Sequence, residues 1–353
     1  MFARIRAKTA KKTFTREELL ASYQELLRRK PADEADVQAH LAAHLTEADF
    51  RASIMKSPEY IALQAPYPGR KIQLSELDAE MNRIDELAQS DTFNDLKETN
   101  SFWVDLPAIS ADPSSHVYMD WVMETYRSIA NQDYATKNEA STFLNQDLAS
   151  VPFPYATRDP HVVGEQLMAI GHVIQSMKLA SGSRILEMGF GWGNTSLQLA
   201  RMGYDVSGID IEKKFVDMVN LQAKMLNVPI RPKQGTFFDI ETLDEKFDAV
   251  LFFESFHHCA DHVRLLKSIP AVLKVGGKLV LAGEAINNAL PYPWGINPGG
   301  QAVYCIRKYG WLELCFRENY LLDLLDGLGW DVVKHNFPQS ATGITYIATL
   351  RAS

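Results

Sequence analysis

Hydrophobic residues recur at helical spacing in the first half of the chain, and strand and helix periods alternate from residue 184 onward. The helical spacing predicts helices over 15–30, 36–45, 75–89, 116–130 and 160–178, with another that opens at Thr46. Thr15 and Glu18 form a capping-box pattern at the start of the first helix, and Pro31 ends it. We therefore expect an α-helical N-terminal region.

The alternating part of the chain predicts βαβ units. Seven segments have strand character: 184–186, 205–209, 230–234, 247–253, 278–282, 330–337 and 344–350. Helices are predicted between them, from 197 onward and at 212–226, 261–273 and 313–328. The predicted fold class is α/β, with a mainly parallel seven-stranded sheet covered on both faces.

Composition narrows the class of protein. The chain has 353 residues, of which 46% are hydrophobic and 23% charged, so two domains can each bury a core. A net charge of −8 argues against a general nucleic-acid binder, since such proteins are usually basic. Cys259, Cys305 and Cys315 show no Cys-x-x-Cys spacing, which argues against a disulfide framework or a thiolate zinc site. This cysteine usage favours the cytoplasm.

No run of about 18 apolar residues is present, so we predict no transmembrane segment. Residues 1–12 are basic but lack the apolar core of a signal peptide. They can make weak contact with an anionic membrane surface, although such a segment is more often a frayed terminus.

The most informative stretch is residues 184–201, RILEMGFGWGNTSLQLAR. A short apolar strand reaches Glu187, and the chain then turns through Gly189, Gly191 and Gly193 into a helix. Glycines at such a turn let a ligand lie against bare backbone, and the helix start offers unpaired N–H groups. The dinucleotide fingerprint G-x-G-x-x-G has a different spacing, because here the pattern is E-x-G-x-G-x-G.

This pattern resembles motif I of the class I S-adenosylmethionine (SAM) dependent methyltransferases. FDAVLFFESFHHCAD at 247–261 and LKVGGKLVLAG at 273–283 resemble later motifs of that family, in order and at normal spacing. The resemblance implies a Rossmann-like class I methyltransferase fold and SAM as cofactor. With it, three regions are predicted: a small helical domain at 1–64, a helical linker or lid at 65–159, and the methyltransferase domain at 160–353. A plain βα turn is the alternative for the glycines alone.

The candidate cofactor residues follow predicted strands, where open α/β sheets bind ligands. Asp210 matches the ribose-binding acid of the family, with helix capping as its alternative role. Family members contact adenine at the positions of Phe238 and Asp239. The predicted cofactor-binding set is Glu187, Gly189, Gly191, Gly193, Asp210, Ile211, Phe238, Asp239 and Phe253.

The candidate catalytic residues are His257, His258 and Glu254, at and just beyond the fourth predicted strand. If the acceptor is a hydroxyl, something must take its proton, and a histidine of near-neutral pKa suits that task. Packing or helix capping is the alternative role of the histidine pair. Glu284, after the fifth strand, is a rival base.

A divalent cation is a further use of these acids. Glu254 and Glu284, with Asp261 or His262, offer oxygen and nitrogen ligands. Our prediction is nevertheless a site without metal.

A segment rich in proline, glycine and aromatic residues, 285–316, separates the fifth strand from the next helix. Structureless segments of this length are usually lids or binding loops. In the family, residues just ahead of motif I often fold over the cofactor or substrate. The candidate substrate residues are Tyr155, Arg158, Glu284, Tyr292, Trp294, Tyr304 and Trp311. Packing in the core or at the domain junction is the alternative role of the aromatic residues and of Arg158.

Two resemblances point to saccharides. The N-terminal helices resemble a small domain that recurs in bacterial surface-polysaccharide enzymes, through Tyr23, Leu26, Leu27, Arg29, Ser57, Glu59 and Tyr60. Residues 295–316 resemble methyltransferase domains fused to bacterial glycan-assembly proteins. The predicted function is O-methylation of a sugar hydroxyl in surface-polysaccharide biosynthesis, without nucleic acid. The alternatives are a natural-product O- or N-methyltransferase and a non-catalytic SAM-binding scaffold. The N-terminal helices can serve docking or assembly into a homo-oligomer.

Overall fold

The computed structural model describes residues 14–27, 30–44, 46–57, 67, 69–89, 95–140 and 150–351. The chain divides into two compact units, Met1–Pro68 and Gly69–Ser353. The predictions for residues 1–12, Arg29, Glu59 and Tyr60 lie outside the described residues, as does part of the 65–70 linker. None of the helices in the described ranges combines the length and apolar character that crossing a bilayer requires.

Within the described residues of the first unit there are three short helices, α1 (Arg16–Leu27), α2 (Glu34–Ala43) and α3 (Glu47–Ile54). The predicted capping box is present, since Thr15 and Glu18 exchange side-chain to backbone hydrogen bonds of 3.2 and 2.8 Å. Phe50 is fully buried between the helices and packs against Phe14 and Tyr23. The predicted helical region is therefore present as three helices with their own small core.

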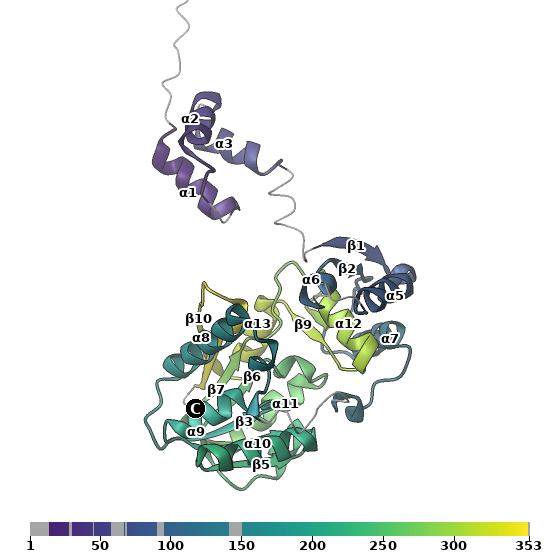
Figure 1. Ribbon diagram of the computed structural model, residues 1–353, viewed down its shortest axis with the longest axis vertical. Coiled ribbons are helices and arrows are strands. Elements are labelled where there is room, and N and C mark those ends of the chain that lie inside the picture. Colours follow the sequence, from purple (N-terminus) through teal and green to yellow (C-terminus); the bar gives the residue numbers. More distant parts are fainter. Residues whose placement is uncertain are drawn as a thin grey trace, which may run out of the picture. The chain divides into compact units, whose positions relative to one another are not determined.

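The second unit is built on a seven-stranded sheet of order β10-β11-β7-β6-β3-β4-β5 (Figure 1). Its strands are β3 (Arg184–Met188), β4 (Asp205–Asp210), β5 (Ile230–Gln234), β6 (Phe247–Phe253), β7 (Leu273–Ala282), β10 (Trp330–His335) and β11 (Thr345–Leu350). β11 runs antiparallel to β7 and β10, and the other pairs are parallel. The mainly parallel sheet is confirmed, as a mixed sheet with one antiparallel strand.

Alternating side chains bury both faces of this sheet. In β6, Ala249 and Leu251 belong to the core under α8 (Pro160–Met177) and α9 (Asn194–Arg201). Val250 and Phe252 face the opposite core, which contains α11 (His262–Ser268) and α13 (Glu318–Gly327). α10 (Lys213–Leu226) packs against α9 beside β5. Burial on both sides is what near-continuous apolar strands predict.

Residues 69–140 and 286–316 form a separate part of this unit, which we call the cap. Its described elements are β1 (Arg70–Gln73), α5 (Leu77–Leu87), α6 (Asp95–Thr99), β2 (Phe102–Asp105), α7 (His116–Ala130), β8 (Trp294–Ile296), α12 (Gly300–Tyr309) and β9 (Leu314–Phe316). Figure 1 shows α7 and α12 side by side although they are far apart in sequence. Tyr118 Oη donates to Trp294 O and Tyr126 Oη donates to Gly310 O, both at 2.6 Å. These buried bonds hold the two cap segments together.

Short 3₁₀ helices complete the unit. They are η1 (Leu74–Glu76), η2 (Thr136–Glu139), η4 (Tyr155–Thr157), η5 (Phe237–Thr242), η6 (Phe256–His258), η7 (Ile269–Val272) and η8 (Ala341–Gly343).

Some sequence predictions need correction. Residues 285–316 are not a loop, since they contain β8, α12 and β9. The helix predicted over 313–328 is wrong at its start, because Leu314–Phe316 pairs antiparallel with β8 and α13 begins at Glu318. The helix predicted over 261–273 ends as an α-helix at Ser268, and a 3₁₀ turn containing Pro270 follows. The separate region 65–159 stays a prediction, although its described residues from 69 onward belong to the second unit.

The packing of the cap generates a stability prediction. A Cβ on Gly300 would lie 2.0 Å from Thr99 O and 2.5 Å from Phe102 O. We expect G300A to destabilise the chain by about 1–3 kcal/mol, because backbone atoms cannot move aside cheaply. The matched control is G171A in α8, where a Cβ meets no atom within 4 Å. Since alanine favours a helix by about 1 kcal/mol over glycine, this control should keep or raise the melting temperature. Thermal unfolding of both variants checks the prediction, and an unchanged Tm for G300A would contradict it.

Candidate active site

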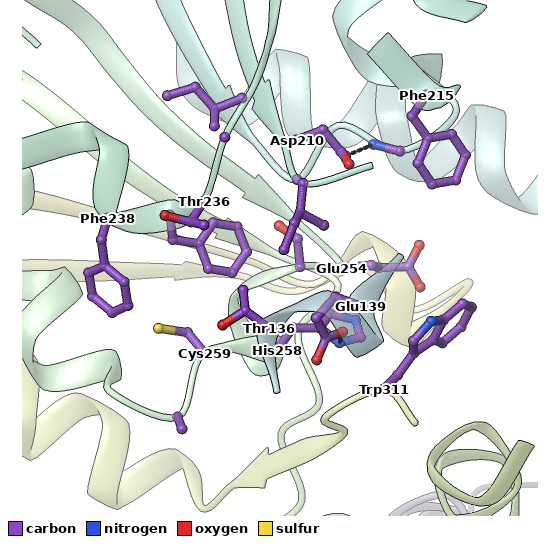
Figure 2. A pocket seen from close by; sticks show the side chains of 18 of the residues that line it. Thr136, Glu139, Asp210, Phe215, Thr236, Phe238, Glu254, His258, Cys259 and Trp311 are labelled. Atoms are coloured by element: carbon purple, nitrogen blue, oxygen red, sulfur yellow. Dashed lines mark hydrogen bonds and ion pairs between the residues drawn. The ribbon is translucent and has the colours of Figure 1, made fainter. Parts of the chain in front are cut away.

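A cavity of about 400 Å³ opens at the carboxyl ends of β3, β4 and β6. The turn after β3 and the end of β4 form part of its wall, and the segments after β5 and β6 form another part. Tyr134, η2 and Trp311 complete the lining from the cap. Figure 2 shows side chains from these distant parts of the chain around one space. This is the edge at which open α/β sheets bind ligands.

The three glycines of the turn after β3 have different surroundings. A Cβ on Gly189 would lie 2.8 Å from Ser255 Cβ, and one on Gly193 would lie 2.5 Å from Val219 Cγ2. A Cβ on Gly191 meets no protein atom within 4 Å, and this residue lines the cavity. Gly189 and Gly193 therefore allow close packing, whereas Gly191 leaves room that only a ligand would use.

Asp210 ends β4 and lines the cavity. Its carboxylate accepts hydrogen bonds from the backbone N–H groups of Gly191 and Glu212, both at 2.8 Å. Burial raises the pKa of Asp210 to about 6, although these two bonds act in the opposite direction. The acid thus binds the turn at Gly191 and still faces the space beside it.

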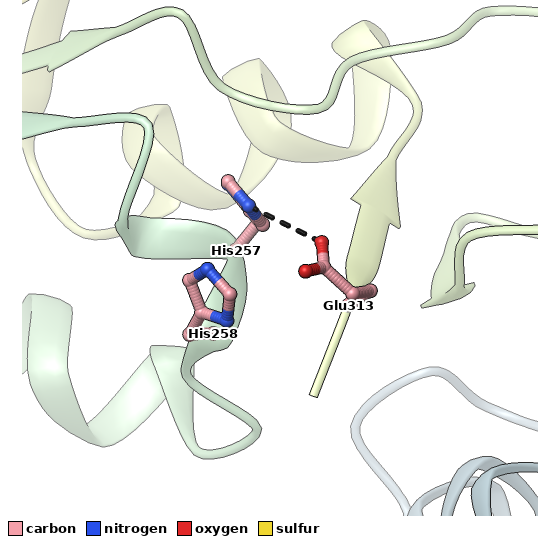
Figure 3. A group of neighbouring side chains, drawn as sticks. All are labelled: His257, His258 and Glu313. Carbon is pink, nitrogen blue, oxygen red and sulfur yellow. Dashed lines mark ion pairs between the residues drawn. The ribbon is translucent and has the colours of Figure 1, made fainter. Parts of the chain in front are cut away.

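A buried hydrogen-bond network holds His257 after β6, and Figure 3 shows this residue beside His258 and Glu313. The Glu284 carboxylate, whose side chain is fully buried, accepts N–H bonds from Ser255, Phe256 and His257 at 3.1–3.2 Å. Its Oε2 atom also lies 2.8 Å from His257 Nδ1. A carboxylate at Nδ1 favours a proton there, which leaves a lone pair on Nε2. His257 Nε2 lies 3.6 Å from Glu313 Oε2.

His258 lines the cavity and meets the cap. Its Nδ1 atom lies 3.3 Å from Glu139 Oε2, a contact that has ion-pair distance but not the angles of a hydrogen bond. The other carboxylate oxygen of Glu139 accepts the Leu312 N–H at 2.9 Å. Burial opposes a charge on His258, but the carboxylates of Glu313 and Glu139 outweigh it and raise its pKa to about 9. The pair therefore lies in a strongly negative field.

Glu254, directly after β6, also lines the cavity. Its backbone has a φ of 52°, which is unusual for a residue with a Cβ. The side chain is accessible from the cavity, yet its enclosure by protein raises its pKa to about 7. The site thus combines an acid with a pKa of about 7 and an imidazole, that of His258, with a pKa of about 9.

Comparison with known proteins follows this geometry. A family described as "Methyltransferase domain" matches residues 186–281. A ubiquinone biosynthesis O-methyltransferase of Coxiella burnetii is 31% identical over 192 residues, covering 50% of this chain and 80% of the relative. The chain belongs to the class I SAM-dependent methyltransferase family.

Other relatives align over shorter stretches. A ubiquinone biosynthesis O-methyltransferase of Cereibacter sphaeroides is 34% identical over 99 residues, which are 28% of this chain and 40% of the relative. A 27-O-demethylrifamycin SV methyltransferase of Amycolatopsis mediterranei is 28% identical over 135 residues, 37% of this chain and 48% of the relative. For both, the alignment spans less than half of the relative's length.

SAM is the cofactor of this methyltransferase family, and its sulfonium supplies an activated methyl group. The cavity fits such a group at two observed points. Gly191 leaves its space unfilled, and Asp210 presents a carboxylate that can accept bonds from ribose hydroxyls. The aromatic rings of Trp192, Phe215 and Phe237 line the same cavity and offer flat apolar faces to a purine.

The structure brings some predicted cofactor residues to the cavity and leaves others away from it. Those that line it are Gly189, Gly191, Asp210, Ile211 and Phe238. Glu187 is buried and accepts a hydrogen bond from Ser196 Oγ, and burial raises its pKa to about 8. Asp239 caps η5 by accepting bonds from Thr236, whose backbone bond is the main reason for its lowered pKa. For these two, and for Gly193 and Phe253, a direct cofactor contact stays a prediction.

Among the predicted catalytic and substrate residues, His258, Glu254 and Trp311 line the cavity, and His257 and Glu284 lie behind it. Tyr292 and Trp294 are buried in the core, where Tyr292 Oη donates to Ile296 O at 2.6 Å and Trp294 Nε1 donates to Pro113 O at 3.1 Å. Their alternative role in packing is the one this geometry supports. Tyr155, Arg158 and Tyr304 do not line the cavity.

Apart from Trp311, the prediction from sequence missed the residues that the cap contributes to the site. Tyr134, Thr136 and Glu139 line the cavity, and Glu313 contacts His257 behind it. No local motif marks these positions, because the cap fold alone brings them to β6. One signal was present, since Glu313 and Trp311 both lie in the segment predicted to be a lid or binding loop.

The different surroundings of two glycines give a second prediction. We expect G191A to weaken SAM binding at least tenfold, because its methyl group projects into the cavity. Its stability loss should stay near the cost of a φ of 48° for alanine, about 1–2 kcal/mol. In G193A the clash with Val219 should mainly lower stability, by a further 1–3 kcal/mol or so. Calorimetry with SAM and thermal unfolding separate the two, and equal SAM affinity in G191A and the unaltered chain would contradict the assignment.

The raised pKa of Asp210 gives a third prediction. The ionised carboxylate is the form that accepts bonds from hydroxyls, so SAM affinity should fall as the pH is lowered through about 6, by up to about tenfold per unit. Glu212 and His258 are the charged groups that act on this acid. D210N should bind weakly at every pH and lose the dependence.

The matched control for this titration is E254Q, which removes the other cavity acid of raised pKa. It should keep the change near pH 6. Calorimetric titrations from about pH 5 to about pH 8 make the comparison. A dependence that disappears in E254Q and persists in D210N would assign the effect to the wrong acid.

Proposed function

We propose that this chain transfers the methyl group of SAM to a hydroxyl oxygen. The observation that carries the proposal is the cluster of His257, His258, Glu284 and Glu313 beside the cavity that holds Gly191 and Asp210. A hydroxyl gives up a proton when it is methylated, and such a cluster can accept that proton. The O-methyltransferases among the relatives support the same reaction class.

The protein residues have two tasks in such a reaction. The glycine turn and Asp210 fix the position of the methyl donor, and the enclosure by Trp311 and the cap excludes water. The histidine cluster handles the proton of the acceptor, and Glu284 orients His257 for this purpose. Aligning the acceptor oxygen with the methyl–sulfur bond supplies most of the remaining acceleration.

The acceptor that we propose is a sugar hydroxyl in bacterial surface-polysaccharide biosynthesis. Among the described residues that line the cavity there is no lysine or arginine, so the methylated part of the acceptor carries no phosphate. Trp311 and Tyr134 offer flat faces, and Glu139, Glu254 and Asp261 offer acceptors for hydroxyl hydrogen bonds. This combination suits a neutral polyhydroxylated ring.

A phenolic or natural-product acceptor is the second candidate. The relatives named for ubiquinone biosynthesis and for 27-O-demethylrifamycin SV favour it, as do the aromatic cavity walls. The full chain, incubated with SAM labelled in its methyl group, should be offered methyl glycosides, surface-polysaccharide fragments and catechols in parallel. Alkali-stable label in the saccharides supports the proposal. Label in the catechols alone would move the assignment to the second candidate, and SAM binding without label in any class favours a scaffold.

A fourth prediction tests whether the histidine cluster is catalytic. H258A should lower kcat by about 10²–10⁴-fold, the usual contribution of a positioned proton acceptor, while SAM binding persists. The matched control is H161A, since His161 is an exposed residue on α8 away from the cavity. Steady-state rates with the labelled acceptor make the measurement. Unchanged turnover in H258A would exclude a catalytic role for this residue.

A further inference from the structure

Three side chains beside the cavity have the composition of a metal site. His257, His258 and Glu313 each present one ligand atom, and these atoms lie within 4.8 Å of one another. Figure 3 shows the two imidazoles on the turn after β6 and the carboxylate of Glu313 directly before β9. Two histidines and one carboxylate are a common ligand set for zinc and other divalent transition metals.

The neighbours of His257 complete the pattern that metal-binding histidines require. Such histidines almost always donate the other ring N–H to a carboxylate or carbonyl, which fixes the tautomer and raises the basicity of the ligating nitrogen. Glu284 lies 2.8 Å from His257 Nδ1, so Nε2 is the nitrogen that faces Glu313 at 3.6 Å. His258 has an analogous carboxylate, with Glu139 3.3 Å from its Nδ1 atom. The outer shell of a metal site is therefore already in place.

The negative charges of the carboxylates around the cluster also favour a bound cation. Glu139, Glu284 and Glu313 are all nearly buried, with side-chain exposures of 12%, 0% and 13%. In the described part of the chain, these carboxylates form ion pairs with His257 and His258. Buried carboxylates without full compensation are costly. A divalent ion would offset this charge without requiring protonated imidazoles.

We propose that His257, His258 and Glu313 bind one divalent transition-metal ion beside the SAM cavity. Three protein ligands leave at least one position open, and His258 places that position at the cavity wall. Imidazole ligands favour transition metals over Mg²⁺ or Ca²⁺. This differs from the metal-free site that we expected from sequence, because Glu313 reaches the histidines only through the cap.

The role of the ion rests on the proposed function. An ion held there would withdraw electron density from an acceptor hydroxyl and lower the pKa of that hydroxyl. The O–H bond would then break, and its proton would pass to the carboxylate of Glu139, which lines the cavity. The acceptor oxygen forms the new bond to the methyl carbon as the carbon–sulfur bond breaks, which leaves neutral S-adenosylhomocysteine. With the ion bound, His257 and His258 would serve as its ligands, and Glu139 would take over the role of proton acceptor that the histidines have in the chain without metal.

The fifth prediction tests the site without any acceptor. The untagged full chain is stripped with EDTA and titrated with Co²⁺, followed by d–d absorption and by elemental analysis after dialysis. We expect one bound ion per chain. H257A, H258A and E313Q should each abolish stoichiometric binding. E284Q removes no ligand, but it should weaken binding about 10–100-fold, because the orientation of His257 is lost.

Controls keep this outcome interpretable. H161A removes an exposed histidine and should bind Co²⁺ as the unaltered chain does. Each variant must still bind SAM, which shows that the fold is intact. Absence of Co²⁺ and Zn²⁺ binding to a chain that binds SAM would overturn the proposal, as would full binding in H257A, H258A and E313Q.

The two proposals fail separately. Methyl transfer at an undiminished rate in the EDTA-stripped chain would refute the role of the ion and leave the proposed function standing. One bound ion that depends on His257, His258 and Glu313, without methyl transfer to any acceptor class, would confirm the metal site and count against the proposed function.

Discussion

The site depends on one buried carboxylate, that of Glu284. It follows β7 and accepts three backbone N–H groups and the Nδ1–H of His257 from the turn after the neighbouring strand β6. These donors would otherwise be buried without partners, at a cost of about 1–3 kcal/mol each. The same bonds fix the turn, the ring orientation of His257 and the direction of its Nε2 atom. Fold stability and site geometry therefore share a single interaction.

A second constraint comes from the cap. Tyr118 and Tyr126 on α7 bind carbonyl groups of the 294–310 segment, so the two cap segments cannot move independently. Glu139 follows α7, and Glu313 follows α12. The Leu312 N–H donates to Glu139, which joins the two segments at the cavity itself. The negative field around the histidines is thus a product of tertiary packing, and rigid buried hydroxyl–carbonyl bonds maintain it.

The sequence could predict the features that have a local cause, but not those that arise from the tertiary packing of the cap. The sheet, the glycine turn, Asp210 and the histidine pair arise from contiguous motifs whose period or spacing has a local physical cause. Glu139 and Glu313 could not be predicted, since Glu139 is more than a hundred residues from His258 along the chain, and no local motif links Glu313 to His257. Trp294 illustrates the opposite case, a residue that was predicted to contact the substrate and is buried in the core. Its place in a proline-rich segment suggested a ligand face, yet it packs edge-on against His262 with ring centroids 4.6 Å apart. Local composition does not tell a buried ring from an exposed one.

Similarity to the relatives gives information about the sheet-forming part of the site but not about the residues from the cap. The family match covers residues 186–281, which include the glycine turn, Asp210 and both histidines. It excludes Glu139, Glu284, Glu313 and Trp311, so the residues that the cap contributes to the site lie outside it. Similarity to the family therefore covers the glycine turn and Asp210, which we propose to hold the methyl donor. The proposed contacts with the acceptor come from the cap. Because specificity is a difference in binding between competing acceptors, our proposed hydroxyl methylation would depend for its choice of acceptor on the side chains that the cap brings to the cavity.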